Sequence, residues 1–188
     1  KTPHPFSVFM GGAKVDDKLP IIKKLIDRCD YLMVGGGIAN SMLKAKGADV
    51  GLSIATDDEK ILKELRELIE KYKKKIILPV DFTIDDGIIY DLGSKSIEIY
   101  KKYIDSSEII FVNGTCGKFE DDRFREGTEK LFKVLYESKK KVIVGGGDTA
   151  NAVKKFGYLD KFDYVSSGGG ATLEYIANKN LVALDWME

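Results

Sequence analysis

The chain has 188 residues, of which 44% are hydrophobic and 32% are charged, with thirty basic side chains against thirty acidic ones. This size and apolar content suit one α/β domain, and the balanced charge gives no support for binding to nucleic acid or to a membrane surface. Cys29 and Cys116 show neither disulfide nor metal-site spacing, and no apolar run approaches the length of a membrane span, so a cytoplasmic location is expected.

Six short apolar runs are expected to form buried strands. They are rich in Ile, Val, Leu and aromatic residues, as strands covered on both faces are. The expected strands are Phe6–Met10, Tyr31–Val34, Ile76–Val80, Ile109–Val112, Val142–Val144 and Tyr164–Ser166. Helical patterns alternate with them. The sequence therefore predicts a single α/β domain over residues 1–188, a three-layer Rossmann-like fold with a mainly parallel sheet of about six strands and helices on both faces.

The segment between the second and fourth expected strands contains a helix and a hairpin. The helix covers Asp57–Lys73, whose apolar residues repeat at helical spacing, and Thr56 with Glu59 is expected to form a capping box at its start. The pair Asp86-Gly87 separates two short apolar runs within Phe82–Gly93. This arrangement predicts a small antiparallel hairpin.

Glycine is concentrated directly after the expected strands. Eleven of the nineteen glycines lie in the clusters Gly11-Gly12, Gly35–Gly37, Gly145–Gly147 and Gly168–Gly170. The carboxyl ends of parallel strands meet at one edge of a sheet, and bare backbone amides at helix N-termini bind anions, phosphate above all. The sequence therefore predicts a phosphate-binding rim. For any single cluster, a tight strand-to-helix turn is the alternative interpretation.

Charged residues accompany two of these clusters. A helix is expected to start near Asp16, which would place Lys18 on its first turn and Lys14 in the preceding loop, both directed to the rim; a surface position is the alternative for Lys18. Asp148 could cap a helix or bind magnesium beside nucleotide oxygens, and Thr149 could donate a hydrogen bond to a phosphate oxygen.

Two other nucleotide-binding signatures are absent or incomplete. No G-x-x-x-x-G-K-[ST] segment occurs, which excludes a Walker-type nucleotidase. Gly145, Gly147 and Ala150 match the dinucleotide fingerprint, but the acidic residue expected about twenty positions later is missing. A nicotinamide-dependent oxidoreductase is therefore a weakly supported alternative.

Eight segments together resemble the C-terminal, nucleotide-binding half of phosphoglycerate kinases. They occur in the family's order and span about residues 5 to 184. The segments are GGAKVDDK (11–18), VGGGIA (34–39), LPVDF (78–82), DLGSKSI (91–97), NGTCGKFE (113–120), EGT (126–128), GGGDTA (145–150) and SSGGGATLEYI (166–176). The short span between LPVDF and DLGSKSI is similar to that of archaeal members.

The resemblance implies an enzyme of glycolysis that transfers a phosphoryl group between 1,3-bisphosphoglycerate and MgADP. It implies that this half binds ADP or ATP, while an N-terminal phosphoglycerate-binding domain, absent from the chain, is its partner. Lys14, Lys18, Gly146 and Gly147 would act in catalysis, and Asp148 would bind Mg²⁺. The implied nucleotide-binding residues are Gly12, Ala13, Lys14, Lys18, Gly36, Gly37, Asn113, Glu120, Gly145, Gly146, Gly147, Asp148 and Thr149. The chain alone is expected to bind nucleotide and to be poorly active.

The chain departs from the family pattern in one loop. Val112-Asn113-Gly114-Thr115 stands where the family usually has Trp-Asn-Gly-Pro, and Lys118 replaces a usually apolar residue. These departures motivate an alternative function, a non-enzymatic adenine-nucleotide-binding module that acts with a partner.

Overall fold

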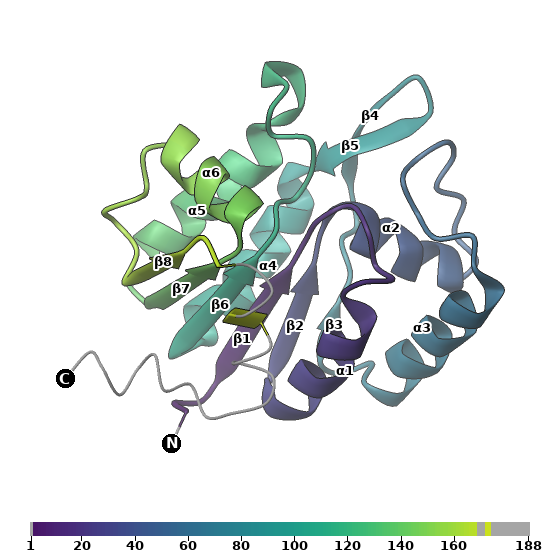
Figure 1. Cartoon of the computed structure of the whole chain (residues 1–188), viewed down its shortest axis with the longest axis horizontal. Coiled ribbons are helices and arrows are strands. Elements are labelled where there is room, and N and C mark those ends of the chain that lie inside the picture. The colour runs from purple at the N-terminus through teal and green to yellow at the C-terminus, as the bar shows by residue number, and fades with distance from the viewer. Residues whose placement is uncertain (1, 169–171, 174–188) are drawn as a thin grey trace.

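A six-stranded parallel sheet runs through the middle of the computed structural model, which describes residues 2–168, 172 and 173 (Figure 1). In spatial order the strands are β3 (Ile76–Ile77), β2 (Tyr31–Val34), β1 (Phe6–Met10), β6 (Ile109–Asn113), β7 (Lys141–Gly145) and β8 (Tyr164–Ser166). Every pairing between neighbours is parallel. All six carboxyl ends therefore lie at the same edge, and the expected parallel sheet is confirmed.

Helices cover both faces of this sheet. One face carries α1 (Leu19–Arg28), α2 (Gly36–Ala45) and α3 (Glu59–Lys71), and the other carries α4 (Ser94–Ser106), α5 (Glu126–Glu137) and α6 (Gly147–Lys155). Side chains alternate along the strands, so Val8 and Met10 enter the first apolar cluster while Phe9 enters the second. Each such fully buried side chain stabilises the fold by about 1.5–3 kcal/mol. The expected three layers are confirmed.

The third strand is shorter than expected. It was predicted over Ile76–Val80, but β3 ends at Ile77, and Val80 is 58% exposed. Because β3 lies at the end of the sheet, it has only β2 as a neighbour. Pro79 lacks a backbone N–H and cannot extend the pairing. The prediction of a buried run to Val80 was wrong.

The start of α3 also differs from the expected capping box. The N-cap residue is Asp58, whose carboxylate accepts hydrogen bonds from the amides of Lys60 (2.8 Å) and Ile61 (3.3 Å). Thr56 instead accepts a bond from the Asp58 amide (3.3 Å). Aspartate is one of the preferred N-cap residues, and its position directly before Glu59 lets it take this role.

The predicted hairpin is confirmed as a separate two-stranded sheet. It consists of β4 (Phe82–Asp85) and β5 (Ile88–Leu92), and it projects beyond the carboxyl edge of the main sheet (Figure 1). Asp86 and Gly87 both have positive φ, 46° and 74°, as two-residue hairpin turns require.

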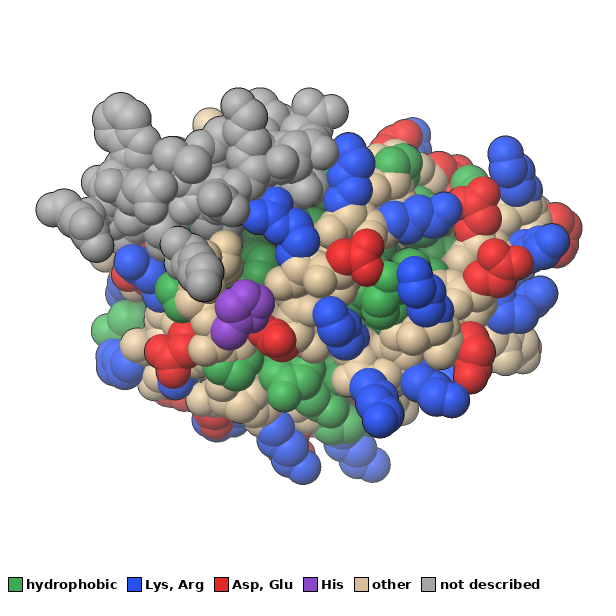
Figure 2. All heavy atoms as spheres, turned by 90° about the horizontal axis from the view of Figure 1, so that it is seen from below, with side chains coloured by type: hydrophobic (Ala, Val, Ile, Leu, Met, Phe, Trp, Pro, Cys, Tyr) green, Lys and Arg blue, Asp and Glu red, His purple; other side chains and the backbone are tan. Residues whose placement is uncertain are grey.

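The opposite, amino edge of the sheet carries interspersed charges of both signs (Figure 2). Among the residues that the structure describes, no helix combines the length and the hydrophobicity that a membrane span requires.

Candidate functional site

The strand order reverses between β1 and β6, and this is where the predicted site residues gather. The chain winds from β1 through β2 to β3 in one direction and from β6 through β7 to β8 in the other. Ligands of open α/β sheets bind in the crevice outside such a switch point. Here the loop after β1 contacts the end of β6 through the backbone, since the Gly11 amide donates to the Asn113 carbonyl (2.7 Å).

Lys18 lies at this crevice, but it precedes the first helix and does not lie on its first turn as expected. Residues 15–18 form a turn, and α1 begins at Leu19, with Pro20 in its first turn, where proline is favoured. The prediction of a helix start near Asp16 was therefore wrong. The Lys18 ammonium donates to the Gly11 carbonyl (2.8 Å) and to Asn113 Oδ1 (2.6 Å). It bridges the ends of β1 and β6.

The environment of Lys18 disfavours its charge. Burial lowers the pKa of the ammonium to about 8, and the nearby Asp148 carboxylate only partly opposes this shift. A buried cation near the strand ends gains stability from an approaching anion, because the anion replaces the lost interaction with water. Lys14, by contrast, is exposed in the loop between β1 and α1.

The N-terminus of α6 presents backbone amides at the same edge. Gly146 precedes the helix with φ of 114°, which L side chains rarely adopt, and the helix begins at Gly147. The amides of Gly147, Asp148 and Thr149 lie in the first turn, where no intrahelical acceptor exists. The N-cap residue, Gly146, has no side chain that could cap them. These donors and the helix dipole together suit a phosphate group.

Asp148 is the one carboxylate in that first turn, and it is exposed. The described residues include no group of three or more side chains that could hold a metal ion. A single carboxylate still fits Mg²⁺, which keeps several waters and commonly binds proteins through one or two carboxylates together with substrate phosphates. The residues present are therefore compatible with Mg²⁺ that arrives with a nucleotide.

Two predicted nucleotide-binding side chains are engaged inside the protein. Thr149 Oγ1 accepts from the Gly114 amide (2.6 Å) and donates to the Gly145 carbonyl (3.2 Å). Asn113 Nδ2 donates to the same Gly145 carbonyl (2.5 Å). Both side chains are buried and tie the ends of β6 and β7 together. Because the Thr149 hydroxyl is engaged in these bonds, only its backbone amide is left to bind a nucleotide.

A cavity of about 480 Å³ opens beside these groups, within the range of small-molecule sites. Six predicted residues line it, namely Gly12, Ala13, Gly36, Gly37, Glu120 and Asp148. Gly37 is required by close packing, because a Cβ there would lie 2.0 Å from the Ala13 carbonyl oxygen. The loop after β1 and the start of α2 thus approach each other at backbone distance, which no larger residue allows.

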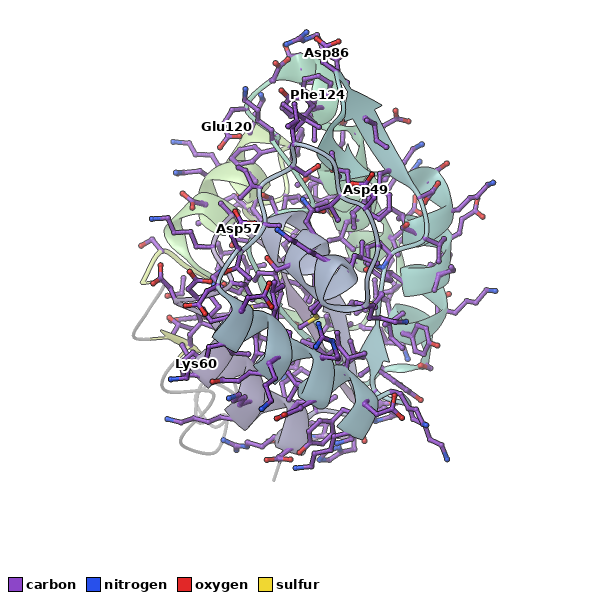
Figure 3. All side chains as sticks on the ribbon, turned by 90° about the vertical axis from the view of Figure 1, so that its right-hand side faces the viewer. Asp49, Asp57, Lys60, Asp86, Glu120 and Phe124 are labelled. Atoms are coloured by element: carbon purple, nitrogen blue, oxygen red, sulfur yellow. The ribbon has the colours of Figure 1, made fainter. Side chains whose placement is uncertain are left out.

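The apolar wall of this cavity was missed by sequence reasoning. It is formed by Leu52, Ile54, Ile88, Ile89, Tyr90 and Leu92. Leu52 and Ile54 are 79% and 62% exposed in a loop without helical or strand periodicity, so no pattern marked them. Figure 3 shows Glu120 at the same end of the molecule as the hairpin tip Asp86, with Lys60 at the other end. The hairpin had been predicted, but not its contribution to a pocket.

Two further sequence features are Cys116 and the last glycine cluster. Cys116 is buried, and burial raises the pKa of its thiol well above the usual range, so it is not a reactive thiolate. The cluster Gly168–Gly170 follows β8 as expected, but Gly169 and Gly170 lie outside the described residues.

Comparison with known proteins gives consistent matches. Residues 1–179 match the family model for phosphoglycerate kinase. The phosphoglycerate kinase of Aquifex aeolicus is 40% identical over 96% of this chain and 51% of its own length. That of Finegoldia magna is 37% identical over 98% of this chain and 52% of its own length. The chain therefore spans about half the length of these curated relatives.

Solved structures agree. The phosphoglycerate kinase structure from Coxiella burnetii has a TM-score of 0.87 and 33% identity, with 95% of this chain and 52% of that chain covered. The structure from Pyrococcus horikoshii has a TM-score of 0.79 and 27% identity, with 96% and 51% covered. The expected likeness to archaeal members stays a prediction.

Proposed function

Because the chain belongs to the phosphoglycerate kinase family, we propose that it is the C-terminal, nucleotide-binding half of such a kinase. One observation carries this proposal: the open N-terminus of α6, the Lys18 ammonium and a cavity with an apolar wall occupy the same edge of the sheet. A phosphate-binding end beside an apolar slot is what an adenine nucleotide needs. The complete cytoplasmic enzyme would transfer a phosphoryl group between 1,3-bisphosphoglycerate and MgADP.

Phosphoryl transfer needs positioning and charge neutralisation more than covalent chemistry from the protein. The Gly147 amide would hold the transferred group, and Lys14 and Lys18 would follow its charge as it moves. The Gly146 amide already donates to the Ser166 carbonyl (2.9 Å), so Gly146 would contribute through its positive φ, which shapes the turn into α6. Asp148 would hold Mg²⁺, which neutralises phosphate charge when bound. The Gly12–Ala13 and Gly36–Gly37 backbones and Glu120 would bind the nucleoside, with Asn113, Gly145 and Thr149 supporting the phosphate end.

In the proposed enzyme, phosphoryl transfer depends on a second domain. The N-terminal domain would supply the phosphoglycerate, so the isolated chain would bind nucleotide and turn over poorly. A non-enzymatic nucleotide-binding module remains the second candidate, because Thr115 and Lys118 depart from the family pattern in the loop after β6.

Two measurements separate these functions. Calorimetric titration of the chain with MgADP should give saturable binding, and no binding at millimolar nucleotide would refute both. The chain should then be assayed with the N-terminal half of the Aquifex aeolicus relative added in trans. Phosphoryl transfer above that of either half alone would support the kinase, whereas nucleotide binding with no gain in transfer would favour the module.

A further inference from the structure

Strand β5 is fastened to the first turn of α5 by a buried carboxylate. Asp91 Oδ2 accepts a hydrogen bond from the Gly127 amide (2.5 Å), and Oδ1 accepts one from the Leu92 amide (2.9 Å). The Asp91 side chain is almost fully buried, with 1% of the residue exposed. Its neighbours Tyr90 and Leu92 line the cavity, whereas the buried Asp91 carboxylate reaches the Gly127 amide, so Asp91 is directed into the protein.

The same turn of α5 also holds the second wall of the cavity, loop 115–120. Thr128 Oγ1 accepts a hydrogen bond from the Cys116 amide (3.1 Å), and Thr128 is fully buried. The loop in turn contacts β5, since the Lys118 amide donates to the Tyr90 carbonyl (2.8 Å). Two walls from distant parts of the sequence are therefore joined at one helix end.

We propose that Asp91 is a positioning residue for nucleotide binding, which fixes the hairpin wall of the cavity relative to loop 115–120 through the N-terminus of α5. This inference rests on the proposed nucleotide-binding function. In this proposal Asp91 contacts neither the phosphates nor the base of the nucleotide. It acts on binding by fixing the shape of the cavity between the hairpin and loop 115–120.

The hairpin depends on such attachments. It forms a sheet of its own with only two strands, and a hairpin of this kind is marginally stable by itself. At its tip the hairpin is held to the loop before α3 by the bonds from the Leu52 amide to the Gly87 carbonyl (3.0 Å) and from the Ile89 amide to Ser53 Oγ (2.7 Å). At its base the Asp91 carboxylate is the buried connection to α5. Loss of an acceptor there would leave buried N–H groups without partners, and the wall would shift to relieve them.

Asp91→Asn hardly changes the volume of the side chain. It tests the proposal because the new amide group would place an N–H donor against a backbone N–H donor. Asp30→Asn is a matched control. Asp30 also accepts a backbone bond, from the Phe6 amide (2.6 Å), but at the amino end of β1, on the far side of the sheet. Affinities for MgADP and for magnesium pyrophosphate are measured for the parent and both variants at pH 7.5, after thermal denaturation shows that each is folded.

We expect Asp91→Asn to weaken MgADP binding about tenfold, the effect of a lost hydrogen bond to a charged group. Pyrophosphate, which lacks the base, should bind within about twofold of the parent, and Asp30→Asn should bind both ligands as the parent does. Unchanged MgADP affinity of Asp91→Asn would overturn the proposal, as would an equal loss for both ligands or the same loss in Asp30→Asn. Should Asp91→Asn fail to fold, Thr128→Val, which removes the second connection, is subject to the same outcomes. A parent that binds neither ligand refutes the proposed function itself.

Discussion

If the chain binds nucleotide as proposed, the lowered pKa of Lys18 should make its nucleotide affinity depend on pH above neutrality. Burial lowers this pKa to about 8, so the ammonium is roughly 90% protonated at pH 7 and roughly 10% protonated at pH 9. The terminal phosphate of a nucleotide is already ionised over this range. If the cation is what binds phosphate, MgADP affinity should fall about tenfold from pH 7 to pH 9, or about 1.4 kcal/mol of binding free energy.

The assay is a titration with MgADP at closely spaced pH values and constant ionic strength. Lys18→Met should bind more weakly at pH 7 and show little further loss up to pH 9. Lys14→Met provides the matched control, because Lys14 belongs to the same loop but is exposed. The Lys14 variant should keep the pH dependence of the parent.

Two results would refute this reasoning. A parent whose affinity is constant from pH 7 to pH 9 would show that the Lys18 proton does not take part in binding. A Lys18→Met variant with the same slope as the parent would assign the titration to another group.

Three further changes test other parts of the account. Asp148→Asn should weaken MgADP binding about tenfold or more while leaving affinity for metal-free ADP nearly unchanged; equal losses in calorimetry would contradict the metal role. Gly37→Ala places a Cβ 2.0 Å from the Ala13 carbonyl oxygen, so urea denaturation should show a loss of about 1–3 kcal/mol in unfolding free energy, and wild-type stability would disprove the close packing. Burial raises the pKa of Asp91 to about 7, with Glu126 adding to the shift. Between about pH 4 and pH 7 the Asp91 carboxyl is therefore protonated in the folded chain and ionised in the unfolded chain. Its contribution to the unfolding free energy falls as the pH rises through this window. The unfolding free energy of Asp91→Asn relative to the parent should accordingly rise by up to about 4 kcal/mol over this window, and a constant difference would rule the shift out.

The sheet and its rim were predictable because their signals are local. Runs such as Phe6–Met10 are mostly apolar, which is typical of strands covered by helices on both faces, and glycine follows directly or within two residues after five of the six expected strands. The parallel arrangement then brings these ends together without any knowledge of the strand order. The phosphate-binding chemistry expected of the rim stays a prediction.

Helix starts and strand ends were less predictable because neighbouring residues compete for one role. Thr56 and Asp58 are both good N-cap residues, and only the path of the preceding loop decides that Asp58 takes the position. Likewise, Val80 reads as part of a buried strand, yet its exposure depends on β3 being at the end of the sheet.

The apolar wall and its support depend on contacts between distant residues. Asp91 and Gly127 are 36 positions apart and nothing in their spacing links them. Leu52 joins the cavity only because its loop pairs with the hairpin turn at Gly87. Such contacts follow from the folded arrangement and leave no periodic signal in the sequence.

The central claim is that the carboxyl edge of the sheet binds the nucleotide, and amide chemical shifts of the isotope-labelled chain during titration with MgADP test it most directly. The account predicts that the largest changes occur at the amides of Gly12, Gly37, Gly147 and Asp148, while those of Phe6 and Ile109 at the amino edge stay constant. Shifts concentrated at the amino edge, or none at saturating nucleotide, would contradict it.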